Sequence, residues 1–156
     1  MKKKTVKVLI ISALILLAGI FVLWCIGSQV ISREAANQVD ALLTRNYDTH
    51  GAYTEDLRDV ISPELYDRLN YRDQHILAYQ SVYGFSPDDS TKEEHRRTYP
   101  TVHFFFTKCY VYYNYTYIVR SKINGESLVG SIDAEVKLTL SLKNGKWVIS
   151  GKEEAP

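Results

Sequence analysis

The fold is decided by residues 109–149, which read CYVYYNYTYIVRSKINGESLVGSIDAEVKLTLSLKNGKWVI. Two Asn-Gly pairs, Asn124–Gly125 and Asn144–Gly145, separate three runs that are rich in β-branched and aromatic residues. Asn-Gly is the preferred loop of a two-residue β-hairpin, because both central residues of that turn need a positive φ. The stretch therefore predicts three antiparallel strands joined by two tight turns.

These turns also predict which residues face one another across the strands. Counting back from the first turn gives the pairs Thr107 with Leu142, Cys109 with Leu140, Val111 with Leu138, Tyr113 with Val136, Tyr115 with Ala134, and Tyr117 with Ile132. The second turn places Leu142 opposite Trp147 and Leu140 opposite Ile149. One face of the sheet is apolar in this register, which favours the prediction. A bulge in the Tyr-rich strand would shift its far end.

Helical patterns precede the sheet. Ser32 is a suitable N-cap for an amphipathic helix over residues 33–45. After a break around Gly51, Thr54 is placed to cap a second helix. The run Ser62–Pro63–Glu64 then restarts a helix, because Ser is a preferred cap and Pro is favoured at the first helical position.

The segment between these helices and the strands is less regular. Residues 70–82 carry no decisive pattern, whereas residues 84–100 are polar and contain Pro87 and Pro100. Such a composition predicts a long exposed loop. Helices followed by an antiparallel meander are the order typical of an α+β fold.

The N-terminal part of the chain has a long uncharged stretch from Val8 to Ser32. About 20 apolar residues allow a helix to cross a bilayer, and lysines before such a helix hold the N-terminus in the cytoplasm. We therefore expect a single-pass protein of the cell membrane. Its expected parts are a cytoplasmic basic tip (1–7), a transmembrane helix in the lipid bilayer (8–30), an extracytoplasmic domain (32–152) and a tail (153–156).

Two other kinds of N-terminal segment have related patterns. A cleaved signal peptide usually has a shorter apolar region that ends in small residues, whereas this one ends in Trp24, Cys25 and Ile26. A lipoprotein would carry its lipid on Cys25, but the bulky Trp24 precedes that position. The uncleaved anchor fits best. Since Cys25 would lie in the membrane and Cys109 in the domain, we expect no disulfide.

The charge of the chain is unevenly distributed. The formal net charge is +1, and Lys2, Lys3, Lys4 and Lys7 supply four of the 19 basic residues. From Arg33 onward there remain 15 basic and 18 acidic residues, a net charge of −3. A mildly acidic domain lacks the basic surface that binding to nucleic acid requires. We expect no nucleic-acid partner.

The order of these elements resembles the NTF2-like superfamily. The resemblance is carried by the helix over 33–45, the restart Ile61–Leu65, the long paired strands and the closing run Leu142–Ile149. It covers residues 32–152, and it implies helices packed on the concave face of a curved antiparallel sheet, which together form a cone. One membrane helix followed by such a domain is also similar to VirB8-type assembly factors of conjugation and secretion machines. The superfamily includes enzymes and non-enzymatic modules, so the fold does not give the function.

The residue types that carry catalysis form no recognisable set. His50, His75, His95 and His103 match neither a zinc-binding spacing nor an HExxH pattern. Cys109 is expected to point inward as an inert apolar side chain. We therefore predict no catalytic residue, no metal site and no cofactor.

Three tyrosines are candidates for the lining of a small pocket. Tyr113, Tyr115 and Tyr117 are expected on the inner face of the sheet, and His103 joins them if no bulge intervenes. The NTF2-like resemblance suggests what such a pocket could contain, because enzymes of that superfamily place a Tyr hydroxyl and an acid or a His in the cone. In the predicted register the nearby acids point to the other face. We therefore expect a packed core or a passive pocket.

The other face of the sheet is a candidate contact surface. Its predicted members are Tyr110, Tyr112, Phe104 and Phe106, next to Lys108 and Lys137. Exposed aromatic side chains often mark contact surfaces, because they offer a large area at little entropic cost. Two alternatives stay open: the polar loop covers these rings, or a bulge turns Phe104 and Phe106 inward.

These features together predict a non-enzymatic interaction or assembly module of a bacterial membrane, with a protein partner or a second copy of itself. Two alternatives remain open. One is a cone pocket that binds a small ligand or acts as an enzyme. The other is a component of a conjugation or secretion envelope complex.

The anchor is expected to stay attached. Because the apolar run is long and Cys25–Ile26–Gly27 is a poor cleavage site, mass spectrometry of the membrane-bound protein should give the mass of the uncleaved chain. A soluble form that begins near Ser28 would show that the segment is a signal peptide.

Overall fold

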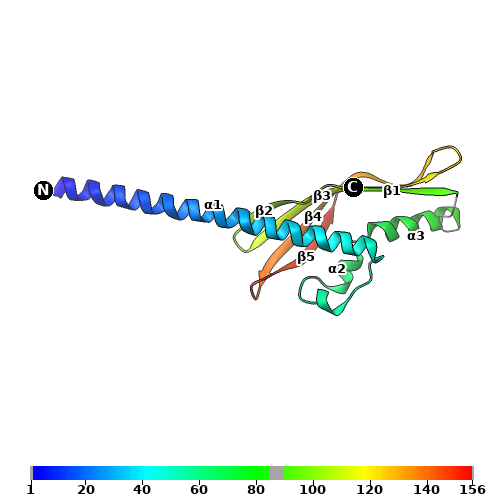
Figure 1. Cartoon of the computed structure of the whole chain (residues 1–156), viewed down its shortest axis with the longest axis horizontal. Helices are drawn as coiled ribbons and strands as arrows, with labels where there is room; N and C mark the ends of the chain where they lie inside the picture. The colour runs from blue at the N-terminus through cyan, green and yellow to red at the C-terminus, as the bar shows by residue number, and fades with distance from the viewer. Residues whose placement is uncertain (1, 85–89, 156) are drawn as a thin grey trace.

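The computed structural model describes residues 2–84 and 90–155, with side chains described from Ile10 onward. In chain order its elements are α1 (Lys2–Asp48), the 3-10 helix η1 (Glu55–Leu57), α2 (Pro63–Asp67), α3 (Tyr71–Tyr83), β1 (Thr91–Arg97), β2 (Thr101–Phe105), β3 (Lys108–Ser121), β4 (Ser127–Lys143) and β5 (Lys146–Glu154). The fold is α+β, as predicted, with a long helix, short helices and an open antiparallel sheet (Figure 1). The side chains of the basic tip, and residues 85–89 of the expected loop, lie outside the described residues.

The helix α1 is unbroken from Lys2 to Asp48, which makes it about 70 Å long. Its apolar part is long and apolar enough to cross a membrane. The C-terminal part packs into the domain instead, where Ala35, Val39 and Leu43 are buried. The expected anchor and the expected helix over 33–45 are therefore one continuous helix that projects from the domain (Figure 1).

The short helices begin close to the residues predicted as caps. The hydroxyl of Ser62 accepts a hydrogen bond of 3.3 Å from the Leu65 amide, which confirms the predicted start of α2. Thr54 precedes only one 3-10 turn and not the expected second α-helix. The side chain of Asn70 accepts a bond of 3.1 Å from the Asp73 amide and caps α3. Residues 70–82, which carry no decisive sequence pattern, are therefore mostly helical and begin at this cap.

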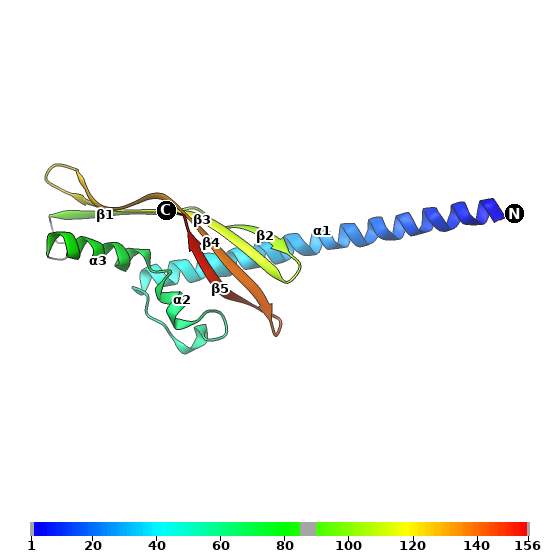
Figure 2. The ribbon, with the colours of Figure 1, turned by 180° about the vertical axis from the view of Figure 1, so that it is seen from behind.

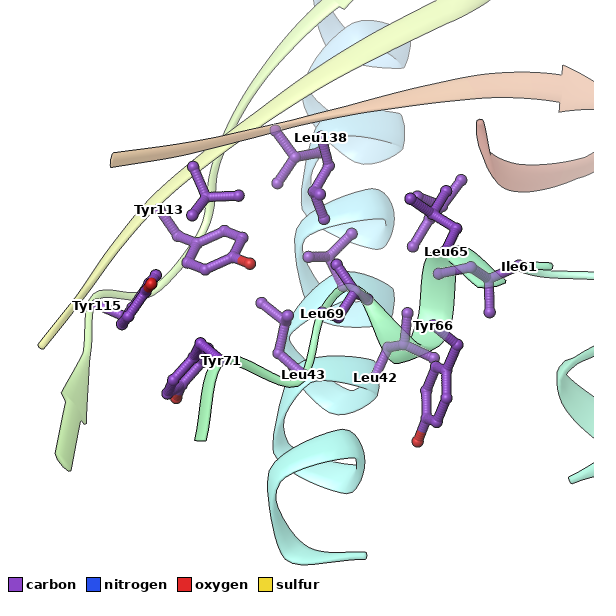
Figure 3. Close-up of a cluster of buried hydrophobic side chains, with 14 of the residues drawn as sticks. Leu42, Leu43, Ile61, Leu65, Tyr66, Leu69, Tyr71, Tyr113, Tyr115 and Leu138 are labelled. Atoms are coloured by element: carbon purple, nitrogen blue, oxygen red, sulfur yellow. The ribbon is translucent and has the colours of Figure 1, made fainter. Parts of the chain in front are cut away.

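The core lies between the helices and one face of the sheet, which we call the inner face (Figure 3). Its members there are Leu42 and Leu43 from α1, Ile61, Leu65, Tyr66 and Leu69 around α2, and Tyr113 and Leu138 from the sheet, each at most 8% exposed. No helix among the described residues covers the opposite, outer face (Figures 1 and 2). On that face Tyr110 and Tyr112 are only half-buried.

The strand β1 shows that the loop expected over residues 84–100 is wrong. Thr91–Arg97 pairs antiparallel with the second half of β3. Six of its seven residues, TKEEHRR, are charged or histidine, so hydrophobic alternation cannot reveal it. Two of its residues form ion pairs with charged side chains on the helices: Glu93 pairs with Arg72, and Arg97 pairs with Asp40.

The strand β2 pairs with the first half of the same edge of β3. A two-residue turn joins them, with Phe105 opposite Lys108. The sequence predicts one strand over residues 103–117, but the observed turn inverts the parity of every residue before it. His103 is therefore exposed on the outer face opposite Tyr110, and the inward placement predicted for it is wrong.

The same turn corrects the two phenylalanines predicted on the outer face. Phe104 is half-buried against the core, with its ring 6.1 Å from that of Trp147. Phe106 lies in the turn itself, where it is 65% exposed and has a φ of 55°. Neither therefore belongs to the surface around Tyr110 and Tyr112.

The second Asn-Gly turn has the predicted geometry. Asn144 and Gly145 have φ values of 50° and 76°, as the two-residue hairpin requires. The predicted pairs of Leu142 with Trp147 and of Leu140 with Ile149 are confirmed. The strand β5 runs on to Glu154, so it includes the first residues of the expected tail.

The first Asn-Gly turn differs from the prediction. Ser121 and Glu126 close a four-residue loop through a hydrogen bond of 2.9 Å, and Asn124 has no positive φ. Two bulges in β4 then add one residue each and restore the predicted register. The pairs from Cys109–Leu140 to Tyr115–Ala134 are confirmed, whereas Tyr117 faces Ser131 and not Ile132.

The bulged strand depends on a glycine. Gly130 has a φ of 149°, and a Cβ atom there would lie 2.1 Å from the Tyr117 carbonyl oxygen. Gly130→Ala should therefore lower the free energy of unfolding by about 3 kcal/mol. Gly125→Ala is the control, since a Cβ there has no atom within 4 Å and only its φ of 74° is strained, for a loss of about 1 kcal/mol. Denaturant unfolding of the detergent-solubilised chain measures both, and equal losses would contradict the bulge.

Candidate functional site

The inner face of β3 carries the three tyrosines predicted there. Tyr113, Tyr115 and Tyr117 are each at most 2% exposed. Tyr113 and Tyr115 lie among the apolar side chains of the core, beside Tyr71 (Figure 3). The Tyr113 hydroxyl has no hydrogen-bond partner among the described residues. The structure therefore brings these tyrosines together as part of a filled core.

Two carboxylates reach these tyrosines, which the predicted register did not anticipate. The hydroxyl of Tyr115 donates to Glu154 Oε1 at 2.6 Å, and that of Tyr117 donates to Glu93 Oε2 at 2.8 Å. Glu93 lies on β1, which was predicted to be a loop, and Glu154 lies at the end of β5, which was predicted to be a tail. The expectation of no inward carboxylate is wrong because both acids come from elements that the sequence did not reveal.

Histidine and tyrosine rings surround this pair of contacts. The rings of Tyr71 and Tyr115 stack with centroids 4.1 Å apart, and those of Tyr47 and His95 stack at 4.0 Å. The Tyr71 hydroxyl is hydrogen-bonded to Nε2 of His95. His75 Nε2 lies 2.9 Å from the hydroxyl of Ser131 on β4. We call this group, together with Tyr117, Glu93 and Glu154, the tyrosine cluster.

Two arginines close the tyrosine cluster towards the helices. Arg72 on α3 donates two hydrogen bonds of 2.9 Å to the carboxylate of Glu93. Arg97 on β1 donates a bond of 2.7 Å to Asp40 on α1. The bidentate pair of Arg72 with Glu93 holds both side chains in a fixed geometry. Together the two arginines attach β1, which has little apolar surface, to α1 and α3.

Burial sets the charge states in the tyrosine cluster. Burial and the hydrogen bonds to carboxylates raise the pKa values of Tyr115 and Tyr117, so both are neutral phenols at neutral pH. His95 is partly exposed, but its desolvation by the packed rings, helped by the charge of Arg97, lowers its pKa and favours the neutral form. Burial opposes ionisation of Glu154, but hydrogen bonds from Lys152 and Tyr115 lower its pKa overall.

This arrangement suits structure better than acid-base chemistry. A general base must be free to accept a proton, whereas the phenols here already donate to carboxylates. Each carboxylate also has a cationic partner, since Arg72 pairs with Glu93 and Lys152 pairs with Glu154 at 2.8 Å. Across residues 2–84 and 90–155, no three His, Cys, Asp or Glu side chains are placed to hold a metal ion.

The other residues singled out from the sequence lie apart from the tyrosine cluster. Cys109 is fully buried, and burial raises its pKa to about 11, so it is a thiol and not a thiolate at neutral pH. His50 is exposed near Arg72 and Asp73. His103 lies on the outer face, where its ring meets Tyr112 edge-on at 5.4 Å.

The outer face holds a second group of aromatic and charged side chains. His103, Tyr110, Tyr112 and Lys137 lie there, and we call them the outer-face patch. The ammonium group of Lys137 lies 5.2 Å from the centroid of the Tyr110 ring and donates to Glu153 at 3.0 Å. All three elements that bear the patch are strands, so their spacing is held by the ladders of the sheet.

Comparisons with known proteins found no relative. No family model matches the chain, and neither the curated proteins nor the solved structures contain a match. The site is therefore interpreted from its own geometry.

The ion pair between Arg72 and Glu93 is expected to support the fold. Their side chains are 19% and 29% exposed, so Arg72→Ala leaves a partly buried carboxylate without its main partner and should lower the free energy of unfolding by about 2 kcal/mol. Arg96→Ala is the control, because Arg96 lies on the same strand as Glu93 and its side chain and that of Asp133 are 69% and 63% exposed. This variant should lower the free energy of unfolding by less than about 0.5 kcal/mol. Equal losses in denaturant unfolding would show that burial of the first pair contributes nothing.

Proposed function

We propose that this protein is a non-enzymatic module, anchored in a membrane by α1, that binds a protein partner or a second copy of itself through the outer face of its sheet. The single observation that carries the proposal is the contrast between the two faces. Helices fill the inner face, whereas the outer face presents the outer-face patch with no covering element among the described residues.

The continuous helix supports the anchoring part of the proposal. An apolar run that is long enough to cross a bilayer leads without a break into the buried residues Ala35, Val39 and Leu43. A helix shared in this way would hold the domain close to the membrane at a set orientation. By the positive-inside rule, the lysines before the apolar run place the domain on the extracytoplasmic side.

The NTF2-like resemblance is part of the same proposal. Helices on one face of an open antiparallel sheet agree with it, and so do the long paired strands β3 and β4. A role in a conjugation or secretion envelope complex would be one form of assembly module. Synthesis of the protein together with transfer or secretion components would support that form.

A pocket function is the alternative, and the tyrosine cluster is the observation that favours it. Tyrosine, histidine and glutamate side chains do converge on the inner face, as in a cone with polar chemistry. The stacking of Tyr71 on Tyr115 and the paired charges favour a packed interior over a ligand site.

The contact surface can be tested by Tyr110→Ser combined with Tyr112→Ser. If these rings bind a partner, the double variant should weaken association about tenfold or more, because aromatic contacts dominate many interfaces. Sedimentation in detergent measures self-association, and crosslinking in the native membrane measures contact with another protein.

Tyr99→Ser is the matched control. Tyr99 is 57% exposed and donates to Asn37 on α1, away from the outer-face patch, so its loss should leave association unchanged. A double variant that stays folded and associates like the unaltered protein would exclude the outer face as the binding surface. Unfolding of the double variant alone would instead assign both rings to the core, which also excludes it.

A further inference from the structure

The turn between β2 and β3 exposes two aromatic rings. Phe105 and Phe106 are each 65% exposed, and their rings meet edge-on with centroids 5.0 Å apart. Apolar side chains of this size seldom stand together in water without a function. Leu142, which is 44% exposed, lies beside them, because its amide donates to the Thr107 carbonyl at 3.0 Å.

The turn has a backbone conformation that seldom suits phenylalanine. Phe106 is the first residue of a two-residue hairpin loop, and its φ is 55°. Glycine is usual at such a position, because a side chain is strained there. Strained placements of bulky residues occur most often at functional positions. Folding alone therefore does not explain Phe106.

The contacts of the preceding segment with α1 show where this turn lies. Arg97 contacts Asp40 and Tyr99 contacts Asn37, so the chain runs towards the N-terminus of α1. Six steps along the extended chain from Tyr99 to Phe105 span about 20 Å, which equals about 13 residues of helix. The phenylalanines therefore come level with about Trp24.

A hollow between β2 and α1 agrees with this level. It is lined by Trp24, Ser28, Gln29 and Ser32 of the helix and by Val102, His103 and Phe104 of the strand. These helix residues end the uncharged run that begins at Val8. Figures 1 and 2 both show the β2–β3 turn beside α1 and pointing towards its N-terminal half.

Lysines flank the exposed rings on two neighbouring turns. Lys108 follows the β2–β3 turn and Lys143 precedes the β4–β5 turn, and both side chains are exposed. The two turns point in the same direction (Figures 1 and 2). Aromatic rings and Trp24 at one level, rimmed by lysines, form the pattern that proteins present to a bilayer interface.

We propose that Phe105 and Phe106 insert into the interfacial layer of the same membrane that α1 crosses, while Lys108 and Lys143 bind lipid phosphate groups. The occupant of this surface is a lipid bilayer and not a second protein chain, because the surface continues the apolar run of α1 at the level where that run ends. The inference rests on the anchoring part of the proposed function, and it holds for either side of the membrane.

The inserted turn would be a second point of attachment. One helix alone leaves the domain free to rotate about the helix axis and to tilt. A second contact on the membrane surface removes this freedom and sets the direction in which the outer-face patch points. Insertion of about 5–10 Å, to the boundary of headgroups and acyl chains, is sufficient.

Spin labelling of the full chain in vesicles tests the inference. Cys25→Ala and Cys109→Ala provide a background without native thiols, and Thr107→Cys carries the label in vesicles of phosphatidylcholine and phosphatidylglycerol in equal amounts. The label should collide more often with oxygen, which concentrates in lipid, than with a water-soluble nickel chelate. Ile123→Cys is the control, because Ile123 is 88% exposed in the β3–β4 loop at the other end of the sheet and should favour the nickel chelate.

A second variant separates insertion from folding. Phe105→Ser combined with Phe106→Gly removes both rings and gives the turn its usual glycine, so the domain should stay folded. The oxygen preference of the label at position 107 should then fall to that of the control at position 123. Lys108→Ser with Lys143→Ser should make the depth of the label independent of phosphatidylglycerol.

Three outcomes would overturn the inference. The label at position 107 could favour the nickel chelate as the control does, or keep its oxygen preference without the two rings. Dipolar broadening between labels at position 107 would instead identify a second copy as the occupant. If alkaline carbonate extracts the unaltered protein from membranes, the anchor itself fails. If the protein resists extraction and the label lies in water, the proposed anchor stands and only the inserted turn is wrong.

Discussion

The packing of the last third of α1 against the inner face of the sheet is the contact on which the rest of the structure depends. Ala35, Val39, Leu42 and Leu43 are buried there, and they belong to the same unbroken helix as the apolar run. Small residues such as Ala35 let the helix approach the sheet closely, and the leucines fill the space towards α2. Because one helix contains both the apolar run and these core residues, loss of their packing would free the sheet from the helix that carries the apolar run.

Charge completes what apolar burial begins. The strand β1 is almost wholly polar, so it adds little to the core, yet it forms one edge of the sheet. Arg72 and Arg97 compensate by joining it to α3 and α1. The buried phenols of Tyr115 and Tyr117 then find acceptors in Glu154 and Glu93, as buried hydroxyl groups require. The contacts of these tyrosines with Glu93 and Glu154 therefore also help to attach β1 and β5, the two ends of the strand order.

The inner face, the outer face and the end nearest Trp24 differ in chemistry. The inner face is filled by the core, the outer face presents half-buried aromatic rings with one lysine, and the end nearest Trp24 presents largely exposed rings with lysines. A membrane and a protein partner would meet different surfaces, so both contacts can be made at once. This separation is compatible with the anchored assembly module that we propose.

The sequence by itself determined the elements whose signals are local. The uncharged run, the Ser62 cap, the Asn144–Gly145 turn and the alternation of β3 with β4 each depend on neighbouring residues, and the α+β class follows from their order. Only the tertiary structure decided the strand β1, the β2–β3 turn and the acids that reach the tyrosines. The partners of Glu93 and Glu154 are distant in sequence, and the turn at Phe106 has a conformation that its residue does not favour. Long-range ion pairs and strained turns are stabilised by their surroundings, and those surroundings exist only once the chain has folded.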